Sequence, residues 1–388
     1  MEREKDSSTG GSLQERFVTQ REAEVLAAIR RRMSNAEIAE NLTISVRTVE
    51  SHVSSLLAKF GVGNRSLLVN LAEEAGRSWI DQLEPPSGLL RMADVGACVG
   101  RADQLRSLSR SWGLAKAGTP EVAFLAGEAG IGKTRLAAEF AKSTLADGSI
   151  VMFGRCDEDR QGPFEAFGDA LAPYVTFCPA ERLHSDVGEL LGDLSRIMPS
   201  VGSRLPRPMD ALQSDANVAR MRLFEAVKRL LRGAGEAAPV LLVIDDLHWA
   251  PQSTLNLLKY LLRGQLRGPV MVLGTYRDVG QSPGFAAFLA EVRRDAVHSQ
   301  LALKGLNQFD VGELVLESGA APVESREALA LEIFAETRGH PFFTVEVIRN
   351  LHESAMRARS DEQRAVPVGV QEVITHRANR LSRRPAES

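Results

Sequence analysis

Eight consecutive residues in the middle of the chain have the types and spacing needed to hold a phosphate group. The pattern GxxxxGK[ST] is fitted at every position by Gly127, Glu128, Ala129, Gly130, Ile131, Gly132, Lys133 and Thr134. Glycines let the backbone fold closely around an anion, so that main-chain amides point at it. We expect Lys133 to lie beside the β- and γ-phosphates of a nucleotide and Thr134 to offer its hydroxyl to Mg²⁺. The alternative is a glycine-rich turn before an ordinary helix.

Two carboxylates, Asp245 and Asp246, follow the apolar run Val240–Ile244. The carboxyl end of a buried parallel strand is where Mg²⁺ can be held beside a phosphate loop. We therefore assign Asp245 to the metal and Asp246 to the attacking water. Without a phosphate loop, the same pair would be interpreted as a helix cap after a core strand.

Arg277 follows another apolar run, Val270–Thr275, and is a candidate sensor of the γ-phosphate at the edge of the sheet. The alternative for a lone arginine is a surface ion pair, which contributes little. With Lys133, Asp245 and Asp246, this arginine completes the set of candidate catalytic residues.

Strands and helices must position these groups. Short β-branched runs predict strands over 121–126, 149–153, 240–244 and 270–275, and a helix follows the first strand from 133 to about 145. Strands that alternate with helices are typical of a parallel α/β fold. From residue 306 helical periodicity returns, over 311–317, 325–337 and 343–353. We predict a P-loop ATPase core over 98–305 and a helical lid over 306–365.

The N-terminal segment 13–76 contains no proline and has strong helical periodicity. Capping boxes beginning at Thr19 and Ser34 predict helices over 20–32 and from 35 to 42. Ser45 can cap a third helix over 46–60, and a fourth is expected from 65 past 71. The third helix has one apolar stripe, made by Val49, Val53, Leu56, Leu57 and Phe60. Two short capped helices joined by a tight turn fit a helix-turn-helix domain, with an unspecialised helical bundle as the alternative.

This segment resembles the LuxR-type helix-turn-helix. The resemblance rests on TQREAEVL at 19–26, SNAEIA at 34–39, TVESHV at 48–53 and KFGVGNR at 59–65. It implies that the third helix enters the major groove of double-stranded DNA and that the fourth helix forms a dimer. The candidate DNA contacts are Ser45, Arg47, Thr48, Glu50, Ser51, His52, Ser54 and Lys59. His52 has helix packing as its alternative role.

The charge of this segment is balanced. Residues 13–76 hold eight Lys/Arg and eight Asp/Glu, so their net charge is zero. Because DNA affinity rises with the number of cationic phosphate contacts, one such domain should bind weakly and be salt-sensitive. Many LuxR-type domains carry a lysine where this chain has Glu50; a glutamate can accept from cytosine N4 but repels phosphates.

The region 98–350 resembles the nucleotide-binding module of the signal-transduction ATPases with numerous domains (STAND), an AAA-related class. The shared strings are VGR at 99–101, the phosphate loop, LVIDDLHWA at 242–250, GTYR at 274–277 and TRGHPFF at 337–343. The resemblance implies that Val99, Gly100 and Arg101 contribute to the nucleotide site and that Pro341 lies near the adenine.

The two regions together resemble the large ATP-binding LuxR regulators. That resemblance implies ATP and Mg²⁺ as cofactors, slow hydrolysis to ADP and phosphate, an ATP-dependent homo-oligomer, and transcription regulation, with RNA polymerase or a sensor protein as further partners. The alternative function is a STAND-type ATPase scaffold whose helical domain binds protein rather than DNA.

Three features depart from those regulators. The helix-turn-helix comes first in the chain, Pro251 stands where an acidic residue is usual, and the sequence ends at Ser388. Residues 368–382 resemble the beginning of a winged-helix domain, so we expect 366–388 to be the start of a truncated winged-helix region or a tail, without sensor repeats.

Composition excludes several other classes of protein. The 388 residues are 44% hydrophobic and 25% charged, which argues against disorder, collagen and coiled-coil rods. The longest aliphatic run is too short to span a bilayer, the first residues are polar, and three cysteines are widely spaced. We expect a cytoplasmic protein without membrane contact, with a flexible leader over 1–12 and a linker over 77–97. The net charge of −3 restricts any DNA contact to a local surface.

Overall fold

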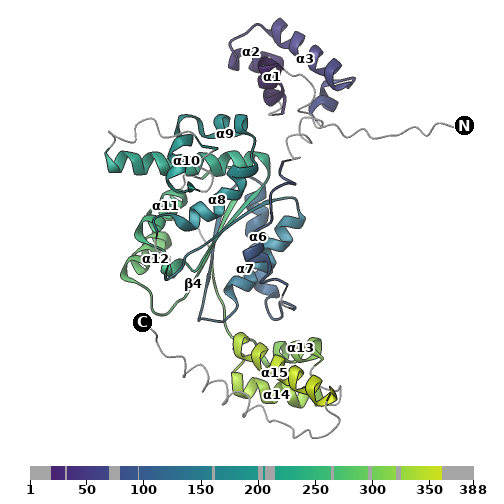
Figure 1. Ribbon diagram of the computed structural model, residues 1–388, viewed down its shortest axis with the longest axis vertical. Helices are drawn as coiled ribbons and strands as arrows, with labels where there is room; N and C mark the ends of the chain where they lie inside the picture. Colours follow the sequence, from purple (N-terminus) through teal and green to yellow (C-terminus); the bar gives the residue numbers. More distant parts are fainter. Residues whose placement is uncertain are drawn as a thin grey trace, which may run out of the picture. The chain divides into compact units, whose positions relative to one another are not determined.

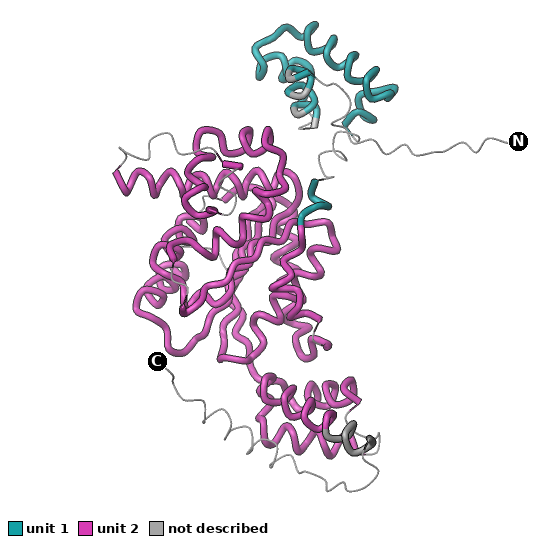
Figure 2. The backbone as a smooth tube through the Cα atoms, viewed as in Figure 1, with its two compact units in different colours: residues 1–83 teal, residues 84–388 magenta. Residues whose placement is uncertain are grey.

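The computed structural model describes residues 19–30, 33–69, 79–94, 96–159, 162–199, 204–205, 215–263, 266–295, 299–319 and 325–360. The chain divides into two compact units, residues 1–83 and 84–388 (Figure 2). The predicted leader and the predicted winged-helix start at 366–388 lie outside the described residues.

The first unit is helical. It contains α1 (Gln20–Arg30), α2 (Asn35–Asn41) and α3 (Val46–Phe60), and residues 65–69 begin the expected fourth helix. Both predicted capping boxes form: Glu22 accepts from the Thr19 amide, and Ser34 and Glu37 bond reciprocally. Ser45 caps α3 as expected. The stripe of α3 meets α1 and α2 in one core, formed by Val25, Ile29, Ile38, Val49, Val53, Leu56, Phe60 and Leu68.

The second unit is built on a five-stranded parallel sheet of order β2-β3-β4-β1-β5 (Figure 1). Its strands are β1 (Glu121–Ala126), β2 (Ile150–Arg155), β3 (Val240–Asp245), β4 (Val270–Tyr276) and β5 (Ser299–Ala302). The first four were predicted. The fifth was missed because it is four residues long and only half-buried at alternate positions, so it lacks an apolar run.

Helices surround the sheet or pack on the helices that cover it. They are α5 (Ser87–Leu90), α6 (Ala102–Lys116), α7 (Lys133–Ala146), α8 (Glu165–Phe177), α9 (Ala180–Val187), η2 (Gly188–Arg196), α10 (Ala216–Ala237), η4 (Leu247–Trp249), α11 (Gln252–Leu262) and α12 (Pro283–Asp295). Helices α6 and α7 pack on the sheet through a core that includes Leu108, Trp112 and Phe140 (Figure 1). Within the part of the chain that the structure describes, no helix has the length and apolarity to cross a bilayer.

Three more helices follow the sheet: α13 (Gln308–Ser318), α14 (Arg326–Thr337) and α15 (Pro341–Ser360). They contain the three helical stretches expected after residue 306. We call residues 306–360 the lid. It has its own small core, in which Val311, Val315, Ile333 and Val347 are buried.

Candidate functional site

The glycine-rich loop joins β1 to α7 at the carboxyl edge of the sheet. Gly127, Gly130 and Gly132 have φ values of 152°, 75° and 97°, which residues other than glycine rarely adopt. A Cβ atom on Gly127 would also lie 2.9 Å from the Leu303 carbonyl oxygen. Backbone strain and lack of space therefore both explain why glycines occupy this loop.

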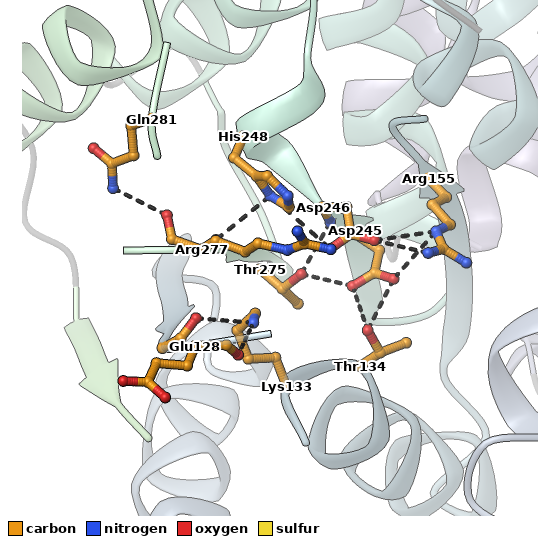
Figure 3. A network of polar contacts seen from close by, with 11 residues as sticks. Glu128, Lys133, Thr134, Arg155, Asp245, Asp246, His248, Thr275, Arg277 and Gln281 are labelled. Atoms are coloured by element: carbon orange, nitrogen blue, oxygen red, sulfur yellow. Dashed lines mark hydrogen bonds and ion pairs between the residues drawn. The ribbon is translucent and has the colours of Figure 1, made fainter. Parts of the chain in front are cut away.

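Lys133 is the first residue of α7, and it is buried. Its Nζ donates to the carbonyl oxygens of Gly127 at 2.9 Å and Glu128 at 2.8 Å (Figure 3). Burial lowers the pKa of Lys133, and the nearby Asp246 opposes this effect. The ammonium is thus held inside the loop by weak neutral acceptors that an anion can replace.

Asp245 is the last residue of β3 and is completely buried. The Thr134 hydroxyl donates to its carboxylate, at 2.9 and 3.0 Å from the two oxygens, and the Thr275 hydroxyl donates at 2.6 Å (Figure 3). Burial and the neighbouring Asp246 raise the pKa of Asp245, while the two hydroxyl bonds lower it. The structure therefore brings together the expected pair Thr134 and Asp245. Thr275 was expected only as a residue of the predicted strand and of the GTYR string. Its hydrogen bond to Asp245 was not predicted.

Asp246 has a left-handed backbone with φ 55°. Its carboxylate accepts from Arg155 at the end of β2, at 2.9 Å from Nη2 and 3.2 Å from Nε. Its amide donates to the Thr275 hydroxyl at 3.0 Å. Arg155 was missed because the predicted second strand stopped at residue 153, whereas β2 continues to Arg155, which lies opposite Asp245.

Arg277 follows β4, at the same edge of the sheet. Its amide donates to His248 Nδ1 at 3.4 Å, and its guanidinium carbon lies 6.0 Å from the ring centroid of Trp249. Burial lowers the pKa of His248 to about 4, so this imidazole is neutral near pH 7. Arg277 thus contacts His248 and Trp249, which follow Asp246 in the chain.

The VGR string and the lid both reach the phosphate loop. Arg101 is buried, and its Nη2 donates to the carbonyl oxygens of Ile131 and Lys304, each at 2.9 Å. Gly100 lies against Asp310 of α13, since a Cβ there would fall 2.6 Å from that carboxylate. Pro341 begins α15, and the residue before it, His340, contacts the Ala129 carbonyl oxygen.

Oxygen ligands are available for a small divalent cation. The described residues contain no group of three or more His, Cys, Asp or Glu side chains suited to a metal ion. Mg²⁺ in phosphate sites is held through one or two carboxylates together with substrate phosphates and waters. Asp245 and Thr134, whose oxygens lie about 3 Å apart, fit that mode.

The candidate DNA contacts lie along α3. Arg47, Thr48, Glu50, Ser51 and Ser54 are exposed, whereas His52 is half-buried. The Ser45 hydroxyl is used as the helix cap, accepting from the Thr48 amide at 3.1 Å.

Lys59 is engaged inside the domain. Its ammonium lies 2.6 Å from the carboxylate of Glu22, which is buried in α1. This ion pair joins α3 to α1, and it gives Lys59 a structural role that the sequence did not suggest.

Two protein families match this chain. Residues 17–72 match the family described as bacterial regulatory proteins, luxR family, and residues 97–273 match the family described as AAA ATPase domain. The two matches fall in different compact units.

Known proteins are similar to part of this chain. An uncharacterized protein from Rhizobium meliloti (strain 1021) is 26% identical over an alignment of 286 residues, which covers 68% of this chain and 26% of that protein. The oxygen regulatory protein NreC of Staphylococcus aureus (strain JH9) is 39% identical over 57 residues, which are 15% of this chain and 26% of NreC. The chain thus spans about a quarter of the length of these relatives.

Solved structures are similar at low identity. The Aeropyrum pernix ORC1 protein in complex with DNA has 18% identity and a TM-score of 0.42, covering 78% of this chain and 69% of that one. The Walker-type ATPase of Pyrococcus abyssi has 15% identity and a TM-score of 0.44, with coverage of 74% and 76%.

Proposed function

We propose that this chain, which carries a LuxR-type helix-turn-helix domain and an AAA ATPase domain, is a transcriptional regulator whose DNA binding is controlled by ATP. One observation carries the proposal. The same polypeptide has a helix, α3, with one exposed polar face, and a glycine-rich loop whose Thr134 contacts the buried Asp245 at 2.9 Å. That contact joins the end of β3 to the start of α7, where a metal–nucleotide complex needs its ligands.

The loop residues grip the phosphates in this proposal. The main-chain amides around Gly130 and Gly132 point at the anion, and Lys133 exchanges the Gly127 and Glu128 carbonyls for phosphate oxygens. Thr134 and Asp245 would hold Mg²⁺, which neutralises phosphate charge when bound. Val99, Gly100 and Pro341 would surround the base.

Hydrolysis would reset the switch. Asp246 would orient the attacking water with its Oδ1, which lies 4.0 Å from His248 Nδ1 at the same strand end as Asp245. Arg155 holds the other oxygen. Arg277 would sense the γ-phosphate. Slow turnover is expected, because a switch must persist long enough to act.

ATP-dependent self-association would connect the nucleotide to DNA. One helix-turn-helix with zero net charge gains little from phosphate contacts. Two linked domains that bind neighbouring half-sites gain affinity through effective concentration, without any new contact. ATP would therefore raise DNA affinity by pairing the domains.

Gel shifts against a genomic fragment library, with and without ATP and Mg²⁺, test this proposal. We expect ATP to raise DNA affinity at least about tenfold in the wild type, as expected for avidity. Lys133→Ala should abolish the response. The matched control is Lys142→Ala, since Lys142 lies on the same helix but is exposed and paired with Asp94. Equal ATP responses in the two variants would contradict the proposal.

A protein-binding scaffold is the second candidate function. It is favoured by the exposed face of α3, where Glu50 offsets the charge of Arg47. It predicts ATP turnover without DNA affinity at low salt, where electrostatic binding is strongest. A tight DNA complex at low salt excludes it.

A further inference from the structure

Two carbonyl groups of the phosphate loop accept hydrogen bonds from residues that lie outside the loop. Arg101 donates to the Ile131 carbonyl oxygen at 2.9 Å. His340 Nε2 lies 3.0 Å from the Ala129 carbonyl oxygen and comes from the lid, 211 residues further along the chain. The lid therefore touches the loop at a main-chain atom.

This contact determines where an amide points. In a trans peptide unit, the C=O of one residue and the N–H of the next point in opposite directions. Because the Ala129 carbonyl is directed at His340, the Gly130 N–H is directed away from the lid. By the same geometry, the hydrogen bond from Arg101 to the Ile131 carbonyl directs the Gly132 N–H away from Arg101. These are amides of the loop that would receive the phosphates.

His340 is held in place by its surroundings. Its ring stacks at a tilt on Phe343, with centroids 4.9 Å apart, and the Gly339 carbonyl oxygen accepts from the Leu306 amide at 2.7 Å. On the other side of the contact, a Cβ added to Gly130 would lie 2.9 Å from Phe342 Cβ. The loop tip and the lid are thus packed closely on each other.

The hydrogen bonds also fix the tautomer of His340. The Ala129 carbonyl can only accept, so Nε2 carries the proton. Nδ1 is buried and has no hydrogen-bond partner among the described residues. Nε2 is therefore the ring nitrogen that bonds to the loop.

We propose that His340 is a positioning residue through which the lid aims the Gly130 amide at the phosphates, so that lid closure and phosphate binding are coupled. The inference rests on the proposed nucleotide site. It assigns His340 no contact with the adenine, and it predicts an effect on ligands that have phosphates but no base.

Three substitutions test whether the hydrogen bond to the Ala129 carbonyl needs a donor at the position of His340 Nε2. Gln carries an N–H donor the same number of bonds from the backbone as His Nε2, whereas Asn carries one at the Nδ1 distance. We expect His340→Ala and His340→Asn to weaken the binding of ADP and of inorganic tripolyphosphate by about tenfold, the effect of losing one well-directed hydrogen bond. His340→Gln should stay within about threefold of the wild type. Titration calorimetry on the full chain measures both ligands.

A second measurement follows the lid itself. ADP should slow amide hydrogen exchange at 341–353 in the wild type and His340→Gln, and much less in His340→Ala at equal occupancy. If His340 had a merely structural role, the substitutions would change thermal stability, but His340→Gln and His340→Asn would not differ in their affinity for ADP and tripolyphosphate.

The outcomes are distinguishable. A wild type that binds neither ligand refutes the proposed function. A wild type that binds both, together with a His340→Ala variant of equal tripolyphosphate affinity and equal lid protection, overturns the role of His340 alone.

Discussion

Asp245 is the residue on which the contacts of the site converge. Hydroxyls from α7 and β4 donate to it, Arg155 Nε lies 3.9 Å away, and the side chain is completely buried. A buried carboxylate is stable only when its oxygens are satisfied. The hydroxyls of Thr134 and Thr275 therefore stabilise the fold as well as shaping the site.

Thr275→Val tests this role. Valine has nearly the shape of threonine, but it removes the 2.6 Å hydrogen bond to Asp245. We expect the free energy of unfolding to fall by about 1–3 kcal/mol, since the buried Asp246 amide loses its acceptor and the Asp245 carboxylate loses one of its two hydroxyl donors. Denaturant unfolding measures the change. Thr275→Ser keeps the hydroxyl and is the control, so equal stability of the two variants would contradict the argument.

At the scale of elements, the contact between α1 and α3 depends on Glu22. This buried residue of α1 accepts from Lys59 and Ser55 of α3 and from Thr19 at its own cap. Hydrogen bonds lower the pKa of Glu22 to about 2. The bond from Lys59 contributes most, and those from Ser55 and Thr19 contribute less. One carboxylate thus adds two polar contacts between α1 and α3 to the hydrophobic core that they share.

Acid should loosen this pair of helices. Because the pKa of Glu22 is lower in the folded state, its carboxylate stabilises the domain fully above about pH 4.5, and this stabilisation is lost as the pH falls toward about 2. Glu22→Gln should cost about 2 kcal/mol at pH 7 and flatten that pH dependence. Thermal unfolding followed by circular dichroism checks both effects.

Glu24→Gln is the matched control for that experiment. Glu24 lies on the same helix, and its ion pair with Arg21 is partly exposed, with side-chain exposures near 37%. A change within about 0.5 kcal/mol is expected there. If Glu24→Gln costs as much as Glu22→Gln, the buried network does not hold the helices.

At the scale of the whole molecule, the match to the luxR family and the match to the AAA ATPase domain fall in two compact units with separate cores. The helical unit has an exposed polar face on α3 with few cations, and the α/β unit has the glycine-rich loop. The proposed function requires a link between the two units. The proposed link is pairing, which changes the number of phosphate contacts per complex and not their individual strength.

The salt dependence of DNA affinity measures the number of phosphate contacts in a complex. The logarithm of DNA affinity falls with the logarithm of salt concentration in proportion to the phosphates contacted. We expect ATP to steepen this slope about twofold in the wild type, as two helix-turn-helix domains replace one. Fluorescence anisotropy at several KCl concentrations gives the slopes. Lys133→Ala should show the shallow slope in both conditions; an unchanged wild-type slope would exclude pairing.

Local signals in the sequence were enough to predict the helices of the first unit, four of the five strands and the glycine-rich loop. Capping boxes, the stripe of α3, four apolar strands and GxxxxGK[ST] depend on residues within a few positions of each other, and their periodicity can be recognised along the chain. The carboxylate pair was also recognisable, because it directly follows an apolar strand.

Tertiary structure alone decided which distant groups meet. Arg155 contacts Asp246 across 91 residues, Lys59 contacts Glu22 across 37, and His340 contacts Ala129 across 211. These contacts depend on the strand order that sets β2 beside β3, on the packing of α1 against α3, and on where the lid lies against the loop. No periodicity in the sequence encodes those relations, because they arise from the burial of whole faces and not from the spacing of neighbouring residues.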